Sequence, residues 1–139
     1  MALHPQIVDL IRRAEEAGVI ATHEMTPREA RAQMEKMSRI RDSDQTLVGT
    51  VEDRVIPGPA GALPIRIYSP SVTSDAAMPA VMFFHGGGHV IGSLDTHDLV
   101  ARNMCVGANC IVVSVDYRLG PEDPFPAAPE DCFAATRWV

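Results

Sequence analysis

The residues most capable of chemistry lie at 85–89, where the sequence His-Gly-Gly-Gly-His follows a short apolar run. Adjacent glycines lose more backbone entropy on folding than other residues and add no side chain to a core. Such a stretch is useful where the backbone must take unusual dihedral angles and bring its N–H groups close to a ligand. The carboxyl end of a parallel strand is also where open α/β sheets bind ligands.

Two ligand classes fit such a glycine loop. A phosphate cradle is disfavoured, because Ile91 stands where the last glycine of Gly-x-Gly-x-x-Gly would be and no Gly-Lys-Ser/Thr follows. An oxyanion hole is favoured, in which free N–H groups face the charge that develops on an attacked ester carbonyl. A glycine-rich turn with no ligand is the third interpretation.

The histidines do not indicate a metal site. His85 and His89 are four residues apart, but the glycines between them exclude the helix that makes this spacing useful for metal binding. We expect no metal and no cofactor. The other histidines are interpreted as surface residues: His97 in the first turn of a helix, His4 and His23.

Composition excludes several classes of protein. The 139 residues include 12 Lys and Arg against 18 Asp and Glu, which gives a net charge of −6 and argues against nucleic acid as a partner. No apolar run approaches the roughly 18 residues of a membrane span, and no secretory signal is visible, so a cytoplasmic location is expected. Three cysteines without metal-ligand spacing are interpreted as reduced core thiols.

The elements that must position the glycine loop follow from periodicity. Residues 3–17 have helical spacing, and Thr26-Pro27 with Glu29 forms a capping box that starts a second helix. From residue 50 the period changes to two, which predicts an antiparallel hairpin around Gly58-Pro59-Ala60-Gly61.

Two short apolar runs, 79–84 and 111–115, predict strands buried on both faces. Helices are expected from near Asp95 to a stop at Gly107, and from about residues 128–130 onward. Strand, helix, strand, helix predicts a parallel sheet of the α/β class. Because no stop signal follows the last helix, we expect the natural protein to continue.

Two sequence blocks resemble a known family. The His-Gly-Gly-Gly at 85–88 stands about thirty residues before Asp-Tyr-Arg-Leu-Gly-Pro-Glu at 116–122, with further similarity at 92–97 and 124–131. At this spacing the chain resembles the hormone-sensitive-lipase family (bacterial family IV) of α/β-hydrolase esterases. The resemblance implies a mostly parallel sheet flanked by helices, with N-terminal cap helices in 1–45 and the N-terminal half of the catalytic domain in 46–139.

The resemblance also implies roles for individual residues. Gly86, Gly87 and Gly88 would form the oxyanion hole, with Gly87 and Gly88 as the N–H donors and Gly86 allowing the turn. His85 would brace the loop by a hydrogen bond without acting as a base, and His89, where the family usually has an aromatic residue, would line the substrate pocket. The residues that would support the oxyanion hole from beneath are Asp116, Tyr117, Arg118 and Glu122.

The nucleophilic side of an esterase site is absent from this sequence. The family places its serine on a Gly-x-Ser-x-Gly turn, followed by an acid and a histidine. No such motif occurs here, and Ser93 and Ser114 are poor substitutes. We therefore expect the chain to be truncated before the nucleophile, inactive and unstable alone, with its missing C-terminal half as a partner; the resemblance also allows a homodimer.

These observations favour a serine carboxylesterase or lipase that cleaves short- to medium-chain acyl esters through an acyl-enzyme. This chain would supply the oxyanion hole and part of the cap. One alternative is a binding protein on the same fold, as in the plant gibberellin receptors that the family resembles, with a small-molecule ligand that is not hydrolysed. Another is an inactive fragment.

Overall fold

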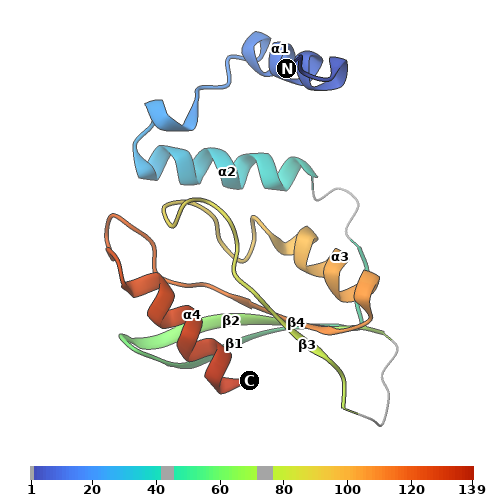
Figure 1. Cartoon of the computed structure of the whole chain (residues 1–139), viewed down its shortest axis with the longest axis vertical. Helices are drawn as coiled ribbons and strands as arrows, with labels where there is room; N and C mark the ends of the chain where they lie inside the picture. The colour runs from blue at the N-terminus through green and yellow to red at the C-terminus, as the bar shows by residue number, and fades with distance from the viewer. Residues whose placement is uncertain (1, 42–45, 72–76) are drawn as a thin grey trace.

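The computed structural model describes residues 2–41, 46–71 and 77–139. Helices and strands follow in the order that the sequence predicts (Figure 1). The elements are α1 (Pro5–Glu16), the short 3-10 helix η1 (Thr22–Glu24), α2 (Pro27–Arg41), β1 (Thr50–Gly58), β2 (Gly61–Ser69), β3 (Ala80–Phe83), α3 (Asp98–Ala108), β4 (Ile111–Val115) and α4 (Ala127–Trp138).

The strands form a mixed sheet of order β1-β2-β4-β3. The predicted hairpin is confirmed, with β1 and β2 antiparallel from the pair Thr50 and Ser69 to Gly58 and Gly61. β2 is antiparallel to β4, whereas β3 and β4 are parallel. This parallel pair brings the carboxyl ends of β3 and β4 to the same edge of the sheet.

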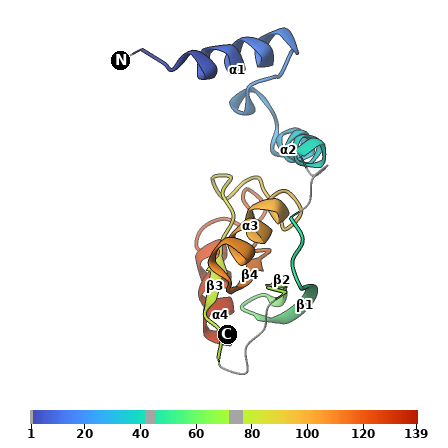
Figure 2. The same ribbon diagram turned by 90° about the vertical axis from the view of Figure 1, so that its right-hand side faces the viewer.

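The two faces of the sheet bury separate apolar clusters, because neighbouring side chains on a strand point to opposite faces. On β4, Val113 and Val115 pack in a cluster with Ala128 of α4. Val112 instead packs with Ala101 and Cys105 of α3. The sheet therefore lies between α4 and α3, as Figure 2 shows.

Strand β3 is less buried than its apolar sequence predicts. Within the described residues it pairs only with β4 and ends the sheet, and its residues range from exposed to half-buried. Phe84, directly after it, is 39% exposed. The expectation of burial on both faces is thus wrong for β3 in this structure, because a strand at the edge has one side without a neighbour.

Helix α3 differs from its predicted boundaries at both ends. It begins at Asp98, because the preceding residues form a turn in which the Ser93 N–H donates to Thr96 Oγ1 (2.8 Å). It does not stop at Gly107; it ends at Ala108, where Asn109 takes the left-handed conformation with φ 47°. Asparagine is among the few residues that tolerate this conformation, so it replaces glycine as the stop.

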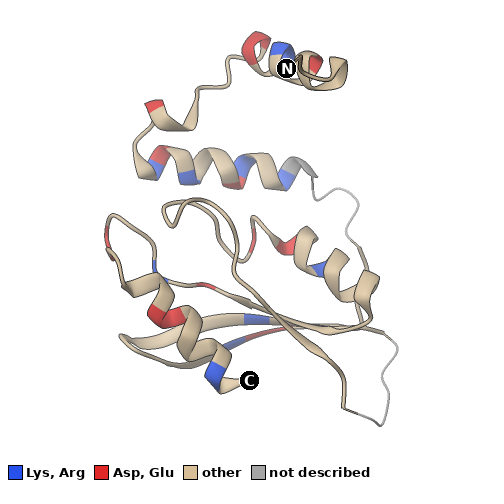
Figure 3. Cartoon of the chain, viewed as in Figure 1, with Lys and Arg blue, Asp and Glu red and all other residues tan. Residues whose placement is uncertain are grey.

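The N-terminal helices lie on one side of the sheet domain. The capping box of α2 is confirmed: the Thr26 N–H donates to Glu29 Oε2 (2.9 Å), and the Glu29 N–H donates to Thr26 Oγ1 (3.3 Å). α2 lies beside the sheet domain and α1 lies beyond it (Figure 2). Acidic and basic residues are interspersed along both helices (Figure 3).

Helix α1 buries none of its residues. Its apolar stripe stays accessible: Leu10 is 63% exposed and Ile7 is 45% exposed. An amphipathic helix ordinarily packs its apolar stripe against a larger body, and within the described residues α1 does not. None of the described helices is both long and apolar enough to cross a membrane. The predicted division at residues 45 and 46 lies partly outside the described residues and stays a prediction.

Candidate active site

The glycine loop follows β3 and has a conformation that requires glycine. Gly87 has φ 130° and Gly88 has φ 62°, both in the region that L side chains rarely adopt. A Cβ atom on Gly87 would also lie 2.0 Å from the Ile91 carbonyl oxygen. The chain continues through His89 at φ 58°, so three successive residues have positive φ. Backbone geometry thus explains Gly87 and Gly88, whereas Gly86 has neither a positive φ nor an atom within 4 Å of its Cβ position.

The loop turns its carbonyl groups inward and leaves N–H groups free. The Gly87 carbonyl accepts hydrogen bonds from the N–H groups of Val90 and Ile91, each at 3.1 Å. Within the described residues, the N–H groups of Gly86, Gly87 and Gly88 donate to no backbone or side-chain acceptor. Gly86 and Gly88 are exposed and Gly87 is half-buried. The arrangement therefore offers unpaired donors to a negatively charged oxygen atom.

His85 is fixed beneath this loop. Its side chain is only 3% exposed, and Nδ1 lies 3.0 Å from the Gly86 carbonyl oxygen. Because a carbonyl only accepts, Nδ1 carries the proton. The Tyr117 hydroxyl donates to the His85 carbonyl oxygen (2.6 Å), and the two rings stack with centroids 4.4 Å apart. These contacts fix His85 in place and connect it to the loop.

Two neighbours of His85 were not assigned to the site from the sequence. Gly92 has φ 101°, and a Cβ atom on it would lie 2.4 Å from His85 Nδ1. The His97 ring stacks on His85 with centroids 5.2 Å apart and also faces Phe83. His97 lies at the start of α3, as expected, but it is half-buried rather than exposed, and this burial lowers the pKa of its imidazole.

The segment after β4 is tied to the glycine loop and to α4. The Gly120 N–H donates to the His89 carbonyl oxygen (2.8 Å). Arg118 holds both carboxylate oxygens of Asp131 on α4, through Nε (2.9 Å) and Nη2 (2.8 Å). Asp131 is only 2% exposed, so this is a largely buried ion pair. It anchors the segment from which Tyr117 reaches His85.

Asp116 and Glu122 differ in their surroundings. The Asp116 N–H donates to the Pro64 carbonyl oxygen (3.0 Å), but its carboxylate has no hydrogen bond within the described residues. Burial raises the pKa of this carboxyl. Glu122 accepts two hydrogen bonds from Arg31 (2.7 and 2.9 Å), which lower its pKa to about 2. Sequence spacing gave no signal for Arg31, because it lies 91 residues from Glu122.

Two cavities flank the loop. One, of about 220 Å³, lies between the loop and the segment after β4, and His89 and Phe125 line it. The other, of about 230 Å³, lies between α2 and the loop, with Met34, Met37 and Ile91 in its wall. Met34 and Met37, three residues apart on α2, thus both face this cavity.

Neither serine near the loop resembles a nucleophile. Ser114 is 1% exposed inside β4, and its hydroxyl has no partner within the described residues. The Ser93 hydroxyl accepts from the Thr96 N–H (3.2 Å) as part of the turn before α3. In the ranges that the structure describes, no three metal-binding side chains come together.

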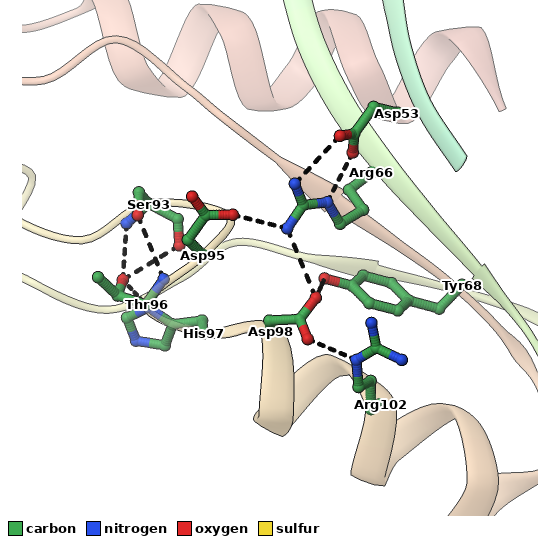
Figure 4. Close-up of polar contacts among 9 residues, drawn as sticks. All are labelled: Asp53, Arg66, Tyr68, Ser93, Asp95, Thr96, His97, Asp98 and Arg102. Atoms are coloured by element: carbon green, nitrogen blue, oxygen red, sulfur yellow. Dashed lines mark hydrogen bonds and ion pairs between the residues drawn. The ribbon is translucent and has the colours of Figure 1, made fainter. Parts of the chain in front are cut away.

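A charged cluster beside the loop supports the start of α3 (Figure 4). Asp98 accepts hydrogen bonds from the Tyr68 hydroxyl (2.7 Å) and from Arg102 Nε. Arg66 also faces Asp98 and holds Asp95 at 2.8 Å. Asp53 on β1 accepts from Arg66 as well (2.6 and 3.1 Å), so three carboxylates surround two guanidinium groups. The cluster links β1 and β2 to α3 and has one negative charge in excess.

Comparison with known proteins finds esterases among the relatives of this chain. Residues 81–139 match the family model described as the α/β hydrolase fold. The chain is 60% identical over 90 residues to the esterase LipI of Mycobacterium tuberculosis, covering 64% of this chain and 28% of LipI. It is 34% identical over 145 residues to an ethyl acetate hydrolase of Pseudomonas putida, covering all of this chain and 46% of that protein.

A solved esterase structure is similar to this chain over its whole length. A hyperthermophilic esterase from Pyrobaculum calidifontis superposes with a TM-score of 0.88 and 38% identity, covering 100% of this chain and 44% of that one. The chain therefore spans less than half the length of the relatives that it matches.

Proposed function

This chain has the α/β-hydrolase fold and resembles esterases of that fold, and from that premise we propose that it supplies the oxyanion hole of a carboxylic ester hydrolase. The observation that carries the proposal is the pair of unbonded N–H groups on Gly87 and Gly88, whose positive φ angles L side chains rarely adopt. Carboxylic esters are the substrate class that such donors suit.

The proposed chemistry follows from the direction of these donors. When a nucleophile attacks an ester carbonyl, negative charge develops on the carbonyl oxygen. Donors already held in place stabilise that charge without reorganising, and the loss of one donor lowers the rate by roughly 10²–10³. His85 and Tyr117 would keep the donors in place, and His85 would not act as the base, because Nε2, its unprotonated nitrogen, is buried away from solvent.

We propose that the nucleophile, acid and base come from a further segment carrying a Gly-x-Ser-x-Gly turn. Support comes from the length of the relatives, of which this chain covers 28% to 46% in the two cases described above. The protein formed by this chain with that segment is called the complete enzyme below. The predicted homodimer and cytoplasmic location stay predictions.

The proposed substrates are small esters with short to medium acyl chains. The two cavities beside the loop are compact, at about 220 and 230 Å³, and their walls include apolar side chains. His89, which lines the smaller one, would contact the substrate. One relative is named for hydrolysis of ethyl acetate, which is a substrate of this class.

The test is hydrolysis of p-nitrophenyl acetate, butyrate and decanoate by the complete enzyme. We expect turnover that falls with the longest chain and disappears when the serine of the nucleophile turn is replaced by alanine. The 139-residue chain by itself should release no p-nitrophenol above the rate in buffer. Saturable binding of esters without turnover would instead indicate a receptor-like protein, and neither binding nor turnover would indicate an inactive fragment.

A further inference from the structure

One arginine joins three separate segments around the glycine loop. Arg31, on α2, donates from Nε to the Val90 carbonyl oxygen (2.8 Å) and from Nη2 to the Gly120 carbonyl oxygen (2.9 Å). Its Nη1 and Nη2 also reach the two carboxylate oxygens of Glu122, at 2.9 and 2.7 Å. Four hydrogen bonds from one planar guanidinium therefore fix α2, the glycine loop and the segment after β4 relative to one another.

We propose that Arg31 is a positioning residue for the oxyanion hole, acting through Val90 on the orientation of the Gly88 N–H group. This inference rests on the proposed function. The hydrogen bonds that connect Arg31 with the Gly88 N–H group form a continuous path. Arg31 holds the Val90 carbonyl, the Val90 N–H donates to the Gly87 carbonyl at 3.1 Å, and that carbonyl shares a peptide plane with the Gly88 N–H.

The planarity of the peptide completes the path. In a trans peptide the carbonyl and the N–H point in opposite directions and rotate together. Because the Gly87 carbonyl is held toward Val90 and Ile91, the Gly88 N–H must point the other way. A loop of glycines has few side-chain contacts to oppose rotation of this plane, so hydrogen bonds have to supply the restraint.

A second path runs through the segment after β4. Arg31 holds the Gly120 carbonyl, and the Gly120 N–H donates to the His89 carbonyl at 2.8 Å. The carbonyl groups on both sides of Val90 are therefore restrained by contacts that lead to Arg31. Without the guanidinium, Gly120 and Val90 would each lose a donor, and α2 would lose its polar connection to the loop.

The ion pair with Glu122 indicates that Arg31 acts by positioning the loop and not by its charge. The carboxylate lies against the guanidinium and neutralises it, so Arg31 adds little net positive potential to the loop. The ion pair is also accessible to water, with the Glu122 side chain 59% exposed, and pairs of this kind contribute little to folding stability. Loss of Arg31 should therefore affect the reaction more than the stability.

The test uses the complete enzyme with Arg31→Ala, Arg31→Lys and Glu122→Gln. Arg54→Ala is the matched control, because Arg54 also pairs with a glutamate, Glu52 (2.6 Å), but lies on β1 away from the loop. We expect Arg31→Ala to lower kcat on p-nitrophenyl butyrate at least tenfold, with KM within about twofold and Tm close to that of the control. Removal of a whole oxyanion donor costs roughly 10²–10³, which sets the upper limit.

The other variants separate positioning from charge. Arg31→Lys keeps the charge but has no planar fork, so its kcat should stay well below that of the wild type. Glu122→Gln leaves both carbonyl contacts of Arg31 available, so its kcat should fall less than that of Arg31→Ala. Methylguanidine at millimolar concentration should partly restore kcat in Arg31→Ala and leave Arg54→Ala unchanged. An Arg31→Ala enzyme with the kcat of the wild type would overturn the inference. So would a fall in kcat that is fully explained by a lower Tm and a smaller fraction of titratable active sites.

Amide hydrogen exchange of residues 86–91 provides a readout that does not depend on hydrolysis. We expect faster exchange in Arg31→Ala than in the wild type and in Arg54→Ala. If the wild type hydrolyses no ester but exchange rises in Arg31→Ala, the proposed function fails and the positioning of the loop by Arg31 stands. If exchange is unchanged, the inference is wrong whatever the activity.

Discussion

The Tyr117 hydroxyl donates a 2.6 Å hydrogen bond to the main-chain carbonyl of His85, which joins the end of β4 to the start of the glycine loop. Both residues are almost completely buried, at 4% and 3% exposed, and their rings are stacked. The bond exists because β3 and β4 are parallel neighbours, so their carboxyl ends lie side by side. The same neighbourhood brings the glycine loop within reach of the segment that follows Tyr117.

Tyr117→Phe should destabilise the complete enzyme and weaken the loop. The change removes a donor and leaves a buried carbonyl without its partner, which costs about 1–2 kcal/mol in the free energy of unfolding. Urea unfolding measures this, and kcat should fall at the same time. As a control, Phe133→Leu changes a side chain that is 65% exposed and should leave both quantities nearly unchanged. Equal stability of Tyr117→Phe and the wild type would show that the hydroxyl bond is not needed.

Gly87→Ala should abolish most activity. The added Cβ atom would lie 2.0 Å from the Ile91 carbonyl oxygen, at a φ of 130° that alanine avoids. The loop can accept it only by moving, which displaces the neighbouring N–H groups. We expect kcat to fall at least a hundredfold, in line with the loss of an oxyanion donor of roughly 10²–10³.

Gly107→Ala is the matched control for that change. Gly107 lies in α3 with open space around its Cβ position and without a positive φ. Alanine favours the helix by about 0.5–1 kcal/mol over glycine, so thermal unfolding should shift upward while kcat stays the same. Similar losses of activity in the two variants would contradict the loop geometry.

Asp98→Asn should destabilise the fold far more than Asp95→Asn, although both carboxylates face Arg66. Asp98 is 8% exposed and also receives the Tyr68 hydroxyl and Arg102. Its replacement leaves Arg102, whose side chain is 16% exposed, without its carboxylate partner, which costs about 2–3 kcal/mol, whereas Arg66 keeps Asp53 and Asp95. The Asp95 side chain is 79% exposed, so its loss should cost less than about 1 kcal/mol. Guanidinium chloride unfolding of the two variants in parallel gives the comparison, and equal costs would contradict it.

Asp116→Asn should stabilise the protein at neutral pH. Burial raises the folded pKa of Asp116 above the ordinary value of 3.8, so the unfolded chain loses this proton first as the pH rises. Ionisation of Asp116 therefore lowers the free energy of unfolding at pH 7, and asparagine removes that loss. The advantage of the variant should shrink as the pH falls toward 3.8 and vanish below it.

Asp53→Asn should show the opposite pH dependence. The hydrogen bond from Arg66 lowers the pKa of Asp53, so its ionisation stabilises the fold above pH 3.8 and this contribution disappears as the pH falls through the folded pKa. The effect should be small, because the Asp53 side chain is 66% exposed. Thermal unfolding between pH 3 and pH 7 measures both variants. If both variants were more stable than the wild type at pH 7, or both less stable, the opposite pKa shifts of Asp116 and Asp53 would be contradicted.

The sequence by itself determined the features that depend on neighbouring residues. The capping box of Thr26 and Glu29, the hairpin turn at residues 58–61 and the alternation of strand and helix all follow from local geometry and from burial of one face. The glycine run at 86–88 also indicated a backbone ligand site, because adjacent glycines are unfavourable inside a strand; the positive φ angles of Gly87 and Gly88 agree with that prediction.

Only the tertiary structure decided which distant residues meet at the loop. The contact of Arg31 with Glu122 spans 91 residues, and that of Tyr117 with His85 spans 32. The position of β3 at the end of the sheet and the stacking of His97 on His85 likewise follow from how the strands pair. Such contacts depend on the packing of whole elements against one another, and the spacing of residue types along a chain contains no measure of that packing.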